Sequence, residues 1–112
     1  MENNINKELC ERRIMGLTDT IRYYAELFNA YKLDSDRTNT MTGFMSIMAS
    51  TLFQLMQAAD DQAVKDNYKT VYEEVCKERD LIKNTDDFHA LRCSILKTMD
   101  KISDTCAERL SA

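Results

Sequence analysis

Proline is absent from this 112-residue sequence, and glycine occurs only twice, at Gly16 and Gly43. Both residue types disfavour helices, proline through its missing N–H and steric clash, and glycine through its backbone freedom. Their scarcity argues against a fold rich in tight turns and leaves room for long helices. Histidine occurs once, so a ferritin-like di-iron site, which needs two Glu-x-x-His motifs, is excluded. No glycine-rich phosphate loop is present either.

Positive charge is sparse and dispersed. The formal net charge is −4, and Arg12–Arg13 is the only adjacent basic pair. Nucleic acids and anionic membrane surfaces are recognised by clustered Lys and Arg. We therefore expect no nucleic-acid partner and no membrane partner.

The cysteine pattern lacks the spacing of known metal or redox motifs. Cys10, Cys76, Cys93 and Cys106 form no C-x-x-C pair, which argues against a zinc ribbon or a thioredoxin-type centre. The first residues, MENNINKELCERR, contain no apolar segment of the signal-peptide kind. The sequence thus predicts a cytoplasmic protein with reduced thiols.

Apolar residues recur at alternating intervals of four and three, which is the period of one helix face. The pattern predicts helices over about 4–33, 40–59 and 61–83, and a fourth that begins after a Thr85 cap. Each carries one apolar stripe, which in the fourth consists of Phe88, Leu91, Ile95, Met99, Ile102, Cys106 and Leu110. Short links favour antiparallel neighbours. We therefore predict an all-α, up-down antiparallel four-helix bundle that forms one domain over residues 1–112. The first helix, at about 30 residues, would be roughly 45 Å long and would overhang the others.

The predicted links depend on turn and capping residues. Residues 34–39, DSDRTN, favour a turn because Asp, Ser and Asn side chains bond nearby backbone groups. Thr38 or Thr40 would then cap the second helix, and Asp60 or Asp61 the third.

Residues 41–59, MTGFMSIMASTLFQLMQAA, contain no charged side chain, although 30 % of the chain is charged. The length matches the about 20 mainly apolar residues of a membrane helix. Six Thr, Ser and Gln side chains interrupt the stretch, so we expect no membrane span.

The same stretch has two different faces. One is an apolar stripe that suits a core, formed by Met41, Met45, Met48, Leu52, Leu55 and Ala59. This apolar arc is widened by Phe44, Ile47, Phe53 and Met56. The opposite one, which we call the uncharged face, consists of Gly43, Ser46, Ser50, Gln54 and Gln57.

Other helices of the chain place Lys, Glu and Asp toward water, as in the predicted solvated face of Glu73, Glu74 and Glu78. The uncharged face has only small and amide side chains. Interface cores are depleted in charge and enriched in Met and aromatic residues. We expect a partner to cover the face, and the alternative is a polar exposed face of a monomer. The predicted partner-binding residues are Gly43, Met45, Ser46, Ser50, Phe53, Gln54, Met56 and Gln57.

Candidate chemistry converges on His89. Asp86, His89 and Cys93 stand at i, i+3 and i+7 of the predicted fourth helix. They could form a Cys-His pair oriented by the carboxylate, or half of a zinc site completed by Cys76. The ordinary interpretation, an exposed histidine beside a capping Asp, is favoured, so we assign no metal and no cofactor.

Residues 88–94, FHALRCS, resemble the phosphate-accepting motif of histidine phosphotransfer domains, which are also four-helix bundles of about this size. In that family Leu stands two residues after the His, Lys three and Gly four. Leu91 matches, Arg92 replaces the Lys and Cys93 replaces the Gly. The resemblance implies His89 as a phosphoacceptor.

The sequence therefore predicts a small soluble helical protein that acts by protein–protein interaction, as an adaptor, an inhibitor or an assembly subunit. We expect self-association through the second helix and no enzymatic activity. A histidine-phosphotransfer-like signalling domain is the alternative.

Overall fold

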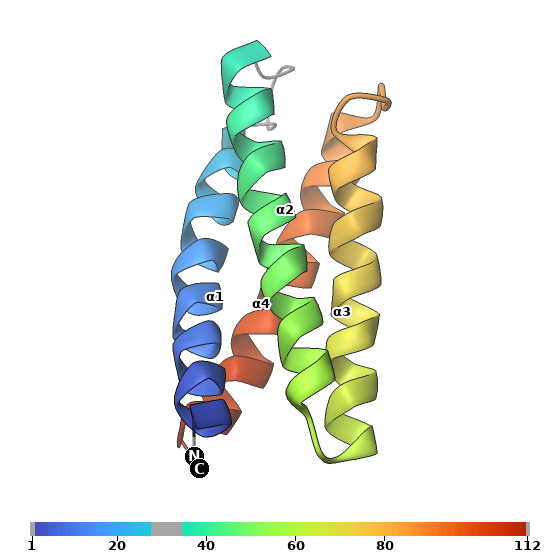
Figure 1. Cartoon of the computed structure of the whole chain (residues 1–112). Coiled ribbons are helices and arrows are strands. Elements are labelled where there is room, and N and C mark those ends of the chain that lie inside the picture. The colour runs from blue at the N-terminus through green and yellow to red at the C-terminus, as the bar shows by residue number, and fades with distance from the viewer. Residues whose placement is uncertain (1, 28–34, 112) are drawn as a thin grey trace.

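The computed structural model describes residues 2–27 and 35–111, with side-chain environments for residues 7–27 and 36–106. This part of the chain is all-helical and contains no strand, which confirms the all-α prediction (Figure 1). The helices are α1 (Glu2–Glu26), α2 (Ser35–Ala58), α3 (Gln62–Leu81) and α4 (Phe88–Ser111).

Each helix packs against two others. α1 contacts α2 and α4, and α3 contacts the same two helices from the other side. The arrangement is elongated, with extents of 46 × 22 × 21 Å, and the start of α1 and the end of α4 lie at the same end of it (Figure 1).

A common apolar core fills the space between the helices, and the predicted stripes supply most of it. All six stripe residues of the uncharged stretch are buried, and so are Leu91, Ile95, Met99 and Ile102 of α4. Burying one side chain of this size stabilises a fold by about 1.5–3 kcal/mol. The main apolar stripe of α2 and these four stripe residues of α4 therefore belong to the core, as predicted.

The start of α2 differs from the prediction. The helix begins at Ser35. The predicted turn over 34–39 is therefore wrong for residues 35–39, which are helical, and residue 34 lies outside the described residues. Thr38 and Thr40 lie inside the helix, where the Thr40 hydroxyl donates to the Asp36 carbonyl at 2.9 Å. Ser and Asp favour helix N-termini as strongly as turns, and here the helix prevails.

α1 has 25 residues, against 24 in α2 and in α4. Its expected continuation over 28–33 lies outside the described residues. A long, overhanging first helix therefore stays a prediction.

Aspartates cap the next two helices. Asp61 accepts a hydrogen bond from the Ala63 N–H at 2.8 Å at the start of α3. Of the two predicted cap residues, Asp60 and Asp61, the second is therefore the cap. At α4 the predicted Thr85 cap is wrong by two residues, because the Asp87 carboxylate accepts from the Ala90 N–H at 3.0 Å. Asp87 immediately precedes the helix, so only its side chain reaches the third helical N–H.

Candidate interaction surface

The uncharged face lies on the outside of α2. Gly43, Ser50, Gln54 and Gln57 are exposed, and Ser46 is half-buried. The helix contacts α1 and α3 through its flanks and directs its Met and Leu side chains into the core. The face is therefore open to a partner in the isolated chain.

The apolar residues around this face differ from those predicted. Met45 is fully buried in the core, so its expected place at the margin of the surface is wrong. Met56 is half-buried, and Phe53 is 39 % exposed with its ring 5.6 Å from that of Tyr72. Ile47, which the apolar period had placed toward the core, is 48 % exposed and belongs to the surface instead.

Exposed apolar side chains concentrate on α1 and α2. Leu9 is 57 % exposed and Tyr23 65 %, and both belong to α1. With Ile47 and Phe53 they make four of the five large apolar side chains exposed in the described part of the chain, and Leu81 of α3 is the fifth. Exposed apolar side chains therefore lie mainly on α1 and α2, although an exposed apolar residue by itself is not informative.

The two glycines of the chain are also exposed on these helices. Neither has a positive φ, and a Cβ built on Gly16 or Gly43 would have no atom within 4 Å beyond its chain neighbours and the adjacent backbone of its own helix. Neither backbone geometry nor packing within the chain therefore requires glycine at these positions. Glycine inside a helix costs about 1 kcal/mol relative to alanine. A partner that approaches the backbone closely would explain why this cost is tolerated.

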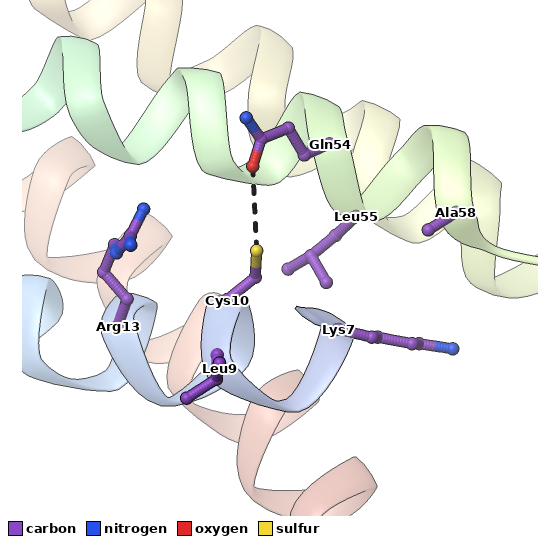
Figure 2. A pocket seen from close by; sticks show the side chains of 7 residues that line it. All are labelled: Lys7, Leu9, Cys10, Arg13, Gln54, Leu55 and Ala58. Atoms are coloured by element: carbon purple, nitrogen blue, oxygen red, sulfur yellow. Dashed lines mark hydrogen bonds between the residues drawn. The ribbon is translucent and has the colours of Figure 1, made fainter. Parts of the chain in front are cut away.

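A groove of about 480 Å³ opens between α1 and the C-terminal part of α2. Figure 2 shows Cys10 and Gln54 facing each other across it, with Arg13 and Lys7 on either side. The Cys10 thiol donates to Gln54 Oε1 at 3.7 Å. The groove thus joins one end of the uncharged face to two cationic side chains of α1.

The sides of the molecule that involve α4 are charged instead. Ion pairs link α1 to α4 through Arg22 and Asp100 at 2.8 Å, and through Arg92 and Glu26 at 2.7 Å. These pairs are partly exposed and each contributes at most about 1 kcal/mol. The ion pairs between α1 and α4 show that other parts of the surface are charged, so the absence of charge is particular to the uncharged face of α2.

Glu78 is the unexpected residue of the charged side. The sequence suggested a solvated position, yet the residue is only 3 % exposed. Glu78 Oε2 accepts from the hydroxyls of Ser94 at 2.5 Å and Thr98 at 2.8 Å, whereas Oε1 is buried without a hydrogen-bond partner. Burial raises the pKa of Glu78 above its ordinary value, and the two hydroxyl donors oppose that shift.

A hollow of about 240 Å³ lies beside this carboxyl group between α3 and α4. Lys101 spans its rim and contacts Glu74 Oε1 at 3.1 Å. The contact between α3 and α4 is the smallest of the four helix contacts. Polar side chains thus replace part of the apolar contact between α3 and α4.

His89 is exposed in the first turn of α4, one residue after the helix begins. Its Nε2 lies 3.8 Å from Cys93 Sγ, as the i, i+4 spacing predicts. The predicted orienting carboxylate of Asp86 makes no hydrogen bond to the ring in the described structure, and the helix-capping side chain is Asp87. No group of three or more metal-ligating side chains gathers among the described residues, so Cys76 does not complete a zinc site.

No protein-family model, curated protein or solved structure matches this chain. Within the described residues, no helix is both long enough and apolar enough to cross a membrane.

Proposed function

We propose that this chain acts by protein–protein interaction and associates with itself through the uncharged face of α2. Its role would be that of an adaptor, an inhibitor or an assembly subunit. The observation that carries the proposal is Gly43, a mid-helix glycine on an exposed face, with open space where its side chain would be. The proposal assigns no catalytic residue, cofactor or metal to the chain, and no nucleic-acid partner.

An up-down antiparallel bundle in a single domain is part of this proposal. It is supported by the contacts between α1 and α2, where Cys10 meets Gln54 and the ring of Tyr24 lies 6.2 Å from that of Phe44. Residue numbers thus rise along one helix as they fall along the other. A cytoplasmic location is proposed as well, because no disulfide joins the cysteines within the described residues.

Ser50→Arg tests the proposal directly. Ser50 is exposed at the middle of the face, so we expect the variant to keep its helical circular dichroism and its unfolding midpoint. A bulky charge in a desolvated contact should convert the dimer to a monomer, from about 26 kDa to the 13.0 kDa of one chain in light scattering.

Thr70→Arg is the matched control, since Thr70 is exposed on α3 and the same charge is added there. The control should keep the mass of the parent protein. Unfolding of the Ser50 variant would mean that the face is core. A dimer that persists would mean that the contact lies elsewhere.

Histidine phosphotransfer is the second candidate, favoured by the exposure of His89 in the first turn of α4. In this function a phosphorylated donor would transfer its phosphoryl group to a nitrogen of the imidazole. Treatment with phosphoramidate should then add one phosphoryl group to the protein, seen as a mass increase, and His89→Ala should prevent it. An unmodified protein under conditions that label free imidazole would eliminate this candidate.

A further inference from the structure

The uncharged face separates two oppositely charged ends. Asp36 lies in the first turn of α2 and shares the outer side of the helix with Gly43, Ile47 and Gln54, because spacings of seven and four residues preserve helical phase. Asp36 is exposed and forms no ion pair in the described structure. Arg37, the next residue, lies about 100° further round the helix.

The opposite end is positive. Gln54 lines the groove with Lys7 and Arg13 (Figure 2), and neither cation has an ion-pair partner among the described residues. Asp36 and Gln54 are eighteen residues apart, or about 27 Å along α2. Along the line from Asp36 through Gly43 and Ile47 to Gln54, the surface therefore has a carboxylate at one end, two cations at the other and no charge between them.

We propose that the occupant of this surface is a second copy of the chain, with its α2 crossed antiparallel about a two-fold axis between Gly43 and Ile47. This inference rests on the proposed function and specifies its partner and geometry. An antiparallel two-fold contact places the acidic end of each copy against the basic end of the other. The face thus complements itself, and two-fold dimers have this kind of isologous interface.

The centre of the surface has the shape that such a contact requires. An axis midway between Asp36 and Gln54 places Ile47 of one copy opposite Gly43 of the other, and this happens twice by symmetry. Ile47 is 48 % exposed and projects from the helix, whereas Gly43 leaves open space within 4 Å. One side chain fills the space that the other residue leaves, and the two backbones approach closely.

The available area is sufficient. The molecule is 46 Å long and about 22 Å wide, whereas a standard interface buries about 800 Å² on each partner. Leu9 and Tyr23, exposed on α1, would extend the apolar contact beyond α2. A foreign partner would need its own matching acidic and basic ends, which a second copy already has.

Charge reversal with light scattering and sedimentation equilibrium tests this geometry. Arg13→Glu alone and Asp36→Lys alone should each raise the Kd of the dimer by about tenfold, because like charges then meet across the contact. The double variant should restore the Kd to within about threefold of the parent, since the reversed charges again attract. Both effects should weaken as salt increases.

Arg12→Glu is the matched control, since it makes the same change one residue away at a side chain already paired with Glu8. It should leave the Kd unchanged. Far-UV circular dichroism checks that Asp36→Lys, which opposes the α2 dipole, keeps its helix.

The outcomes separate this inference from the proposed function. In one outcome, Ser50→Arg dissociates the parent dimer, but the charge-reversal variants and their double variant have the same Kd as Arg12→Glu. This outcome would overturn the antiparallel geometry and leave self-association intact. A parent protein that stays at 13.0 kDa at every concentration would overturn both.

Discussion

Leu52→Ala is expected to lower the free energy of unfolding by about 2–5 kcal/mol. Leu52 is fully buried in α2, within the core that all four helices line. Truncation removes apolar contacts and leaves a cavity, because α2 is held by neighbours on both flanks and cannot collapse into the space. Urea unfolding followed by circular dichroism, at a concentration where the protein is monomeric, measures the loss.

Ile47→Ala is the matched control, a similar aliphatic truncation five residues away on the same helix. Ile47 is 48 % exposed, and alanine has the better helix propensity, so we expect a change below about 0.5 kcal/mol in the monomer. The same variant should raise the Kd of the dimer. Equal losses of monomer stability at the two positions would contradict the division of α2 into a core side and a contact side.

Glu78 should make the protein less stable as the pH rises. Burial raises the pKa of this carboxyl group above its ordinary value of 4.5. The folded chain therefore retains a proton that the unfolded chain has already lost. The stabilisation is fully present below pH 4.5 and disappears as the pH rises through the folded-state pKa. Each unit of difference between the two pKa values is worth about 1.4 kcal/mol.

Glu78→Gln removes this dependence and keeps an oxygen for the hydroxyls of Ser94 and Thr98. The stability of the variant minus that of the parent protein should grow from pH 4 upward and level off above the folded-state pKa of Glu78. Urea unfolding at a series of pH values measures this difference. Glu73→Gln, a matched change at an exposed residue of α3, should show no such trend. A difference that is flat or falls with pH would contradict the assignment.

The sequence predicted the core of α2 and α4 because apolar side chains there follow the helical period without interruption. It failed at Glu78 because a carboxylate is ordinarily counted as polar. The signal was present, since Glu78 continues the phase of Tyr68, Val71 and Val75 toward Ile82. A charged residue in phase with an apolar stripe indicates a buried polar contact, here completed by hydroxyls from α4.

The candidate surface could be predicted only in part. The absence of charge and the helical phase were sufficient to locate Gly43, Ser50 and Gln54 on the outside of α2. Phase alone did not place Ile47, because it lies at the edge of the apolar arc and its exposure depends on where α1 packs. The groove that brings Arg13 next to Gln54 depends on the register between α1 and α2, which no pattern within a single helix contains.

Four of the seven methionines, Met41, Met45, Met48 and Met99, are fully buried. A thioether in this position is shielded from peroxide as long as the helices stay together. Oxidation turns it into a polar sulfoxide that a dry core accommodates poorly. Each transient opening under oxidative stress would therefore risk a lesion that hinders repacking, so the oxidative lifetime of the chain is set by how often its helices separate.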